Sequence, residues 1–177
     1  MDFEASSKAP DPSNLPPLMT EVFAHWRDAG AGNVLPAWKD FHLDQLPPGA
    51  VPWCAVMDVA FDPLDFTYRF YGTARKQLQG DEYTGRSVRD LQPARFAQKA
   101  FEELSNVVER AAPLHFTTVF GKSGASSGQY HSLRMPLSDD GKMIHHVVTF
   151  TEGGPNFRQI HEAFGTDAPV QHHPLLE

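Results

Sequence analysis

The chain has 177 residues, enough for one domain with extensions at about 150 residues per domain. It is 41% hydrophobic and 21% charged, as globular proteins are, and its net charge of −7 comes without a basic stripe, which argues against nucleic-acid binding. The single cysteine excludes an intrachain disulfide, and no apolar run approaches the roughly 20 residues that a membrane-spanning helix needs. The first four residues do not resemble a secretory signal, so we expect a soluble cytoplasmic protein without membrane insertion.

The N-terminal 50 residues predict a tail followed by one helix and a connector. Residues 1–17 are rich in proline, serine and aspartate, which predicts a flexible tail. A helix is predicted over residues 18–29, where Val22, Phe23 and Trp26 form an apolar stripe and Gly30 ends it. The prolines of residues 35–48 indicate a connector, so residues 18–50 form the second segment.

Residues 51–152 predict the folded domain. Alternating residues predict strands over 51–60 and 66–73, with Phe66, Tyr68 and Phe70 on the inward face of the second. A short helix over 74–80 and a long amphipathic helix over 94–110 follow. Three more strands are predicted, over 114–120, 129–137 and 143–151. The glycines and prolines of residues 153–177 indicate a C-terminal tail, with one short helical piece near residues 157–164.

Several short stretches occur in an order that is typical of one family of sensory domains. They are Trp26 with its glycine-ended helix, Asp62-Pro63-Leu64-Asp65, Tyr68-Arg69-Phe70-Tyr71-Gly72-Thr73, Gly80-Asp81, Thr84-Gly85-Arg86-Ser87, Asp90-Leu91 and Pro136-Leu137-Ser138-Asp139-Asp140-Gly141. In order and spacing, the chain resembles the PAS domain family, and most closely a bacterial subgroup whose members are often stand-alone single PAS domains.

The resemblance implies an α+β fold with a five-stranded antiparallel sheet, helices on one face and an N-terminal helix. It also implies a ligand pocket between sheet and helices, and a homodimer paired through the N-terminal helix at Val22, Phe23 and Trp26. For Trp26, packing on its own sheet is the alternative. A haem sensor of this family would need a histidine on the long helix, and a flavin photosensor a cysteine in the short helical region before it. Residues 94–110 contain no histidine, and Cys54 lies on the first predicted strand, so haem and flavin are both disfavoured and the cofactor stays unknown.

The residues expected to bind a ligand are those predicted to face the pocket. They are Tyr68, Phe70, Phe96, Phe116, Tyr130, Arg134 and His146. If Arg134 or His131 points into the pocket, either can bind an anionic ligand through charge-assisted hydrogen bonds. The alternatives are an ion pair for Arg134 and plain core packing for the aromatic residues.

Metal binding and catalysis are not expected. His115, His131 and His146 on adjacent strands would suit zinc, but exposed or hydrogen-bonded histidines are the ordinary case. Cys54 has no predicted base beside it, so a buried, inert thiol is expected. A small cup-shaped enzyme would need Asp58 or Asp65 in an apolar cavity, whereas both are predicted at a strand end or turn.

The pattern therefore predicts a non-catalytic sensory or signalling module that binds a small molecule, a signalling protein partner, or both. Two alternatives remain open at this point: a pure protein-interaction module with a filled core, and a small enzyme.

Overall fold

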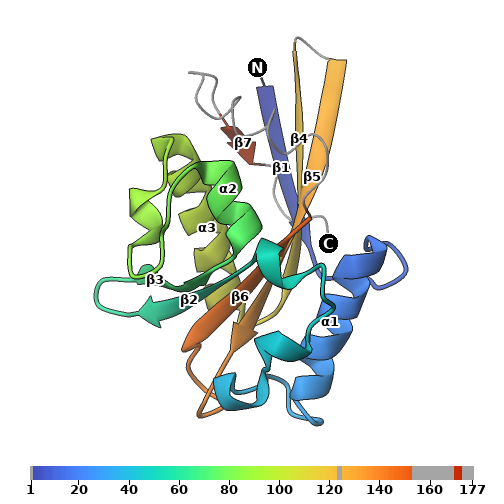
Figure 1. Cartoon of the computed structure of the whole chain (residues 1–177), viewed down its shortest axis with the longest axis vertical. Coiled ribbons are helices and arrows are strands. Elements are labelled where there is room, and N and C mark those ends of the chain that lie inside the picture. Colours follow the sequence, from blue (N-terminus) through green and yellow to red (C-terminus); the bar gives the residue numbers. More distant parts are fainter. Residues whose placement is uncertain (1, 123–124, 153–169, 173–177) are drawn as a thin grey trace.

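The computed structural model describes residues 2–122, 125–152 and 170–172, which form one open sheet with helices on both sides (Figure 1). Its helices and strands are β1 (Asp2–Lys8), α1 (Pro17–Ala29), β2 (Cys54–Ala60), β3 (Asp65–Tyr71), α2 (Thr73–Gln79), α3 (Ala94–Arg110), β4 (Leu114–Lys122), β5 (Ala125–Leu137), β6 (His146–Thr151) and β7 (Val170–His172). Four single-turn helices, η1 (Trp38–Asp40), η2 (Leu43–Gln45), η3 (Val51–Trp53) and η4 (Val88–Asp90), lie in the connections.

The sheet confirms the predicted fold class. Its strand order is β3-β2-β6-β5-β4-β1-β7, and the first five of these strands are the five antiparallel strands predicted from the sequence. Helices α2 and α3 cover one face, and α1 covers the other (Figure 1). We call the face under α2 and α3 the inner face, and the region in which these two helices pack on it the cup.

The N-terminal residues differ from the prediction of a flexible tail. Residues 2–8 form β1, which pairs antiparallel with β4 from Asp2 opposite Gly121 to Lys8 opposite His115. The edge of a sheet offers a row of unpaired backbone groups, and an extended segment without proline can satisfy them. The first proline of the chain is Pro10, so residues 2–8 are free to pair. Of the predicted C-terminal tail, 170–172 form β7 beside β1, and the rest, with the short helix expected near 157–164, lies outside the described residues.

Each face of the sheet closes a separate hydrophobic core. The inner core holds Phe66, Tyr68 and Phe116 with the buried side of α3, including Leu104. The outer core holds α1 side chains packed on alternate residues of β2, β5 and β6. Its buried members are Leu15, Met19, Val22, Trp26, Phe41, Leu46, Ala50, Cys54, Val56, Leu133, Met135, Leu137, Val148 and Phe150. No helix in the described part of the chain is long and apolar enough to cross a membrane.

A β-bulge at Arg69 changes which side chains of β3 face inward. The register with β2 shifts between Val56, opposite Phe70, and Met57, opposite Tyr68, so Arg69 is the extra residue. Beyond a bulge the alternation of faces restarts. Phe70 therefore packs against the outer core and Tyr71 takes the inward position, which corrects the prediction that Phe70 faces the pocket.

Candidate functional site

The inner face of the sheet is buried and yet polar. Directly opposite residues on antiparallel strands share a face, which places Thr149 with Arg134, Thr151 with Ser132 and Thr118 with Tyr130. All of these six residues are buried. The outer face of β5 and β6 is mostly apolar, with Leu133, Met135 and Val148 among its residues, although β4 places the buried His115 there opposite Leu133.

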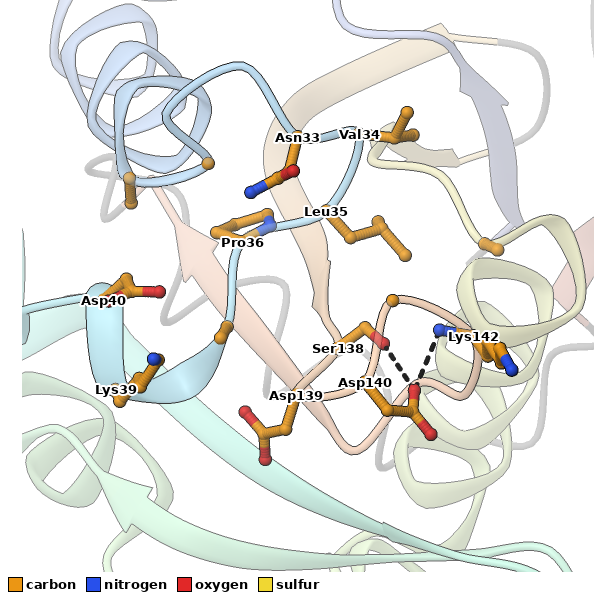
Figure 2. Close-up of a pocket in the computed structure, with 15 residues that line it drawn as sticks. Asn33, Val34, Leu35, Pro36, Lys39, Asp40, Ser138, Asp139, Asp140 and Lys142 are labelled. Atoms are coloured by element: carbon orange, nitrogen blue, oxygen red, sulfur yellow. Dashed lines mark hydrogen bonds between the residues drawn. The ribbon is translucent and has the colours of Figure 1, made fainter.

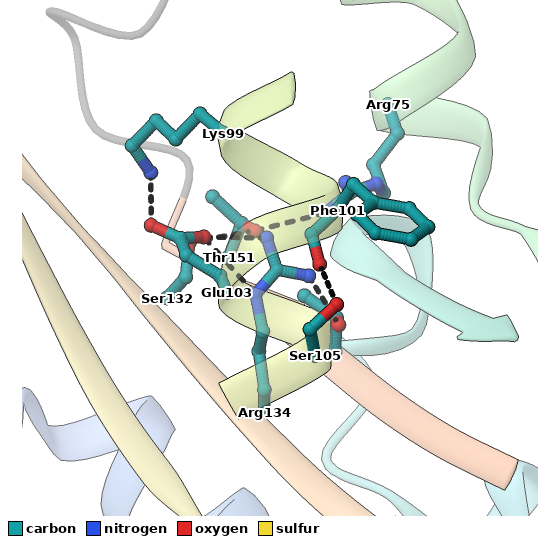
Figure 3. Close-up of polar contacts among 9 residues, drawn as sticks. Arg75, Lys99, Phe101, Glu103, Ser105, Ser132, Arg134 and Thr151 are labelled. Carbon is teal, nitrogen blue, oxygen red and sulfur yellow. Dashed lines mark hydrogen bonds and ion pairs between the residues drawn. The ribbon is translucent and has the colours of Figure 1, made fainter. Parts of the chain in front are cut away.

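A buried ion-pair network spans the cup from α3 to β5 (Figure 3). Glu103 on α3 accepts hydrogen bonds from Nε and Nη2 of Arg134, at 3.1 and 2.7 Å, and from Nζ of Lys99 one turn earlier on the helix. Arg134 also donates to Oγ1 of Thr149 at 2.9 Å. Burial opposes the charged forms, but Lys99 and Arg134 outweigh it and lower the pKa of Glu103, while Glu103 raises the pKa of Lys99. The ion pair therefore favours the charged forms of Glu103 and Lys99.

Arg75 on α2 enters the same inner region from the other helix (Figure 3). Its side chain is buried, donates to Oγ1 of Thr151 at 2.8 Å, and lies with its guanidinium carbon 5.3 Å from the ring centre of Tyr71. Thr151 is linked in turn to Ser132 at 3.2 Å. No carboxylate of the described residues is within ion-pair distance of Arg75, in contrast to Lys99 and Arg134.

Three polar atoms beside this network are buried and have no hydrogen-bond partner in the described part of the chain. They are Nε of Arg75, the hydroxyl of Tyr71 and Oγ1 of Thr118. Burial raises the pKa of Tyr71, against the opposing charge of Arg75, so its hydroxyl remains a proton donor at neutral pH. A buried donor without a partner costs roughly 1–3 kcal/mol, so such atoms need an explanation.

Five of the seven predicted ligand-binding residues lie at the cup. Tyr68, Phe96, Phe116 and Tyr130 are buried in the inner core, and Arg134 points into the cup, where it is held by Glu103. The ion pair that we kept as the alternative for Arg134 is thus present. The sequence analysis missed Arg75, Lys99 and Glu103.

His146 lies away from the cup, contrary to the prediction. Its Nδ1 is 2.8 Å from Oδ1 of Asp58, which also accepts from Nε of Arg69 at 2.6 Å, and its ring packs on Trp38 at 5.6 Å. The strand predicted over 143–151 begins at His146, and Asp58, opposite it on β2, is on the outer side with Trp38. The site of His146 is therefore a surface network of the outer face.

The predicted dimer residues pack on their own sheet. Val22 and Trp26 are fully buried in the outer core, and the indole nitrogen of Trp26 donates to the carbonyl of Pro136 at 2.9 Å. Phe23 is partly buried and stacks on Trp26 at 5.9 Å. A side chain buried within one protomer offers no surface to another, so Val22 and Trp26 do not form a dimer interface.

The other polar residues considered for chemistry lie outside the cup or are already paired. Cys54 is buried in the outer core, and burial raises the pKa of its thiol to about 12, so it is an inert thiol. His115 and His131 contact each other at 3.0 Å, and the described residues contain no group of three or more side chains suited to a metal. Asp58 is paired as above, and Asp65 accepts from Ser87 at 3.0 Å, so neither stands alone in an apolar cavity.

A hollow of about 690 Å³ opens on the surface between residues 30–40 and the turn that follows β5 (Figure 2). The carboxylate of Asp140 points into the turn, where it accepts from Oγ of Ser138 at 3.1 Å and from the backbone N–H of Lys142 at 2.8 Å. It therefore holds the turn in shape. Asp140 thus serves the loop itself, and we take the cup as the stronger candidate site because its polar side chains are buried.

No protein-family model and no curated protein matches this sequence. Solved structures similar to the chain include a light-oxygen-voltage domain studied with a flavin analogue, at 17% identity over 60% of this chain and 81% of that one, with a TM-score of 0.41. An RNA-binding light-oxygen-voltage receptor matches at 12% identity over 91% of this chain and 41% of that one, with a TM-score of 0.44. The light-state dimer of the fungal blue-light photoreceptor Vivid matches at 16% identity, 81% and 97% coverage and a TM-score of 0.41. At these values the likeness carries no conclusion about a ligand or an activity of this chain.

Light-oxygen-voltage domains recur among these matches and one was studied with a flavin analogue, which conflicts with the expectation that flavin is disfavoured. That expectation depended on where the single cysteine lies. A cysteine would be needed for a covalent bond to a flavin, whereas binding needs only a pocket of suitable shape with a few polar groups. The position of Cys54 therefore gave no ground for disfavouring flavin, and the expectation is withdrawn.

Proposed function

We propose that this protein is a non-catalytic sensory module of the PAS type, which binds a small molecule in the cup between α2, α3 and the inner face of the sheet. One observation carries the proposal: the inner face is buried and yet carries a group of polar side chains around Arg134 and Arg75, with polar atoms that have no partner among the described residues. A core built for stability alone is best apolar, because each buried polar group costs free energy unless it is paired. Polar groups that converge in an enclosed space are the usual mark of a ligand site.

The proposed mechanism is a shift between two arrangements of the domain that bind the ligand with different affinity. The two arrangements would differ in the helices over the cup, since α2 and α3 contribute Arg75 and Glu103 to it. We assign no reacting group. The residues considered for catalysis, Cys54, Asp58 and Asp65, are buried in the outer core or engaged by neighbouring side chains.

A protein-interaction module with a filled core is the second candidate. The observation that favours it is the ion-pair network, because Lys99, Glu103 and Arg134 occupy part of the cup with groups that satisfy one another. A homodimer and a signalling partner remain predictions. Any such interface must use a surface other than Val22 and Trp26, which are buried.

Native mass spectrometry of gently purified protein, compared with the same sample after denaturation, tests the proposal. A mass excess that disappears on denaturation is the expected result. The bare mass in both samples would contradict the sensory proposal and favour the interaction module. An absorption spectrum of the same sample identifies a flavin by its visible bands, and the native mass also reports the oligomeric state.

A further inference from the structure

We infer that the ligand of the cup is a small anion with a carboxylate or phosphate group, and that Arg75 is its main contact. This rests on the proposed function, because it names the class of ligand that the same site would take.

The buried charges around the cup do not balance. Among the described residues, the buried cations are Arg75, Lys99 and Arg134, at 6%, 2% and 6% exposure, and the one buried carboxylate is that of Glu103. Glu103 is shared between Lys99 and Arg134. The cluster therefore has two positive charges in excess, in a place from which water is largely removed.

Arg75 carries the part of this excess that has no anionic partner among the described residues. A buried guanidinium is normally paired, because burying an uncompensated charge is costly. Arg75 has the hydroxyl of Thr151 at 2.8 Å and the face of Tyr71, and the described part of the chain offers its Nε no acceptor. A guanidinium has five N–H donors in a planar fork, which matches the two oxygens of a carboxylate or phosphate.

The groups beside Arg75 are neutral hydroxyls, which can donate a hydrogen bond to an anion. The hydroxyl of Tyr71 has no partner within the described part of the chain, and it keeps its proton, since burial raises its pKa. Tyr68, whose ring centre lies 4.9 Å from that of Tyr71, also has its pKa raised by burial. The free hydroxyl of Tyr71, beside a cation that has no carboxylate partner among the described residues, favours a ligand rich in acceptors, which an anion is and a neutral amide is not.

A matched pair of probes tests the class of ligand. Thermal unfolding of the full chain is followed at constant ionic strength with succinate, benzoate and inorganic phosphate, and with the neutral amides succinamide and benzamide. At least one of these anions should raise the melting temperature, and its amide, where there is one, should not. Replacing Arg75→Gln should weaken binding of that anion about tenfold to hundredfold, as expected for the loss of a charged hydrogen-bonding partner.

Arg86→Gln is the matched control. Arg86 also lies over a tyrosine, with its guanidinium carbon 4.4 Å from the ring centre of Tyr83, but it is paired with Asp81 on the surface. Its replacement should leave anion binding unchanged. If Arg75→Gln does not fold, Thr151→Val serves instead, because it removes the hydroxyl that accepts from Arg75 and leaves the charge in place.

The outcomes separate this inference from the proposed function. A retained or titrated anion that depends on Arg75 supports both. A neutral ligand retained in native mass spectrometry would support the sensory proposal and overturn the anion. Wild-type protein that retains nothing and responds to no anion would overturn both, because the excess charge would then be neutralised by another part of the chain.

Discussion

A single substitution at Glu103 should strongly lower the free energy of unfolding. Its carboxylate is the shared partner of Lys99 and Arg134, and all three side chains are buried. Glu103→Gln keeps the size of the side chain and removes its charge. Two buried cations then lose their counter-charge at the same time, while the amide still offers one acceptor.

Breaking a buried ion pair by removing one partner typically costs about 3–5 kcal/mol. A domain of this size is stable by about 5–15 kcal/mol in total, so the variant should lose a large part of its stability. At about 2–4 °C for each kcal/mol in a chain of this length, the melting temperature should fall by roughly 6–20 °C.

Urea unfolding followed by circular dichroism measures the loss, and Asp81→Asn provides the control. Asp81 pairs with Arg86 at 2.7 Å, as short as the contact between Glu103 and Arg134, but both partners are exposed. An exposed pair contributes about 0–1 kcal/mol, so the control should change stability little. If the two variants lost equally little free energy of unfolding, Glu103 would not be the counter-charge of a cluster shielded from water. The excess of positive charge in the cup would then no longer support an anionic ligand.

Three further perturbations test other parts of the fold. Trp26→Phe removes the donor to the carbonyl of Pro136 and should cost about 1–3 kcal/mol in urea unfolding. Gly72→Ala should cost about 3 kcal/mol or more, because its Cβ would lie 2.2 Å from the carbonyl oxygen of Pro52; Gly49→Ala, whose Cβ would meet only ordinary contacts, should not. Burial and the neighbouring His131 lower the pKa of His115 from 6.5 to about 4, so the unfolded chain binds its proton first as pH falls. Stability should therefore decrease between about pH 6.5 and 4, by up to about 3 kcal/mol, and His115→Gln should flatten this dependence in urea unfolding measured at several pH values.

Helices and strands with a strong period were predicted well, and the exceptions have local causes. The long helix was predicted over residues 94–110, the bounds that α3 has. The alternation on β3 was right as far as Tyr68 and wrong at Phe70, because the bulge at Arg69 adds one residue. A bulge depends on pairing with a second strand, so the period of one strand cannot reveal it. Strand β1 was missed for a related reason, since its partner β4 is more than 100 residues away along the chain.

The polar cluster of the cup had a signal in the sequence that was not used. Phe96, Leu104 and Val107 mark the buried side of the long helix, and Lys99 and Glu103 fall on the same side, three and seven residues after Phe96. An oppositely charged pair spaced by four residues on an otherwise apolar side indicates a buried ion pair, which must have a further partner. The sequence does not show that this partner is Arg134, nor that Arg75 comes close with no carboxylate partner among the described residues. Both facts depend on how α2 and β5 are arranged in space.

Strand β5 connects the two faces of the sheet. Arg134 points into the cup toward Glu103. The residue after it, Met135, is buried in the outer core, and the carbonyl of Pro136 accepts the hydrogen bond from Trp26. Helix α1 cannot separate from this strand cheaply, because burying a side chain such as Met19, Val22 or Trp26 contributes about 1.5–3 kcal/mol each, together as much as the stability of a typical domain. If a change in the cup displaced Arg134, the neighbouring residues of β5 that pack on α1 would therefore shift slightly. Helix α1 would stay docked on the sheet.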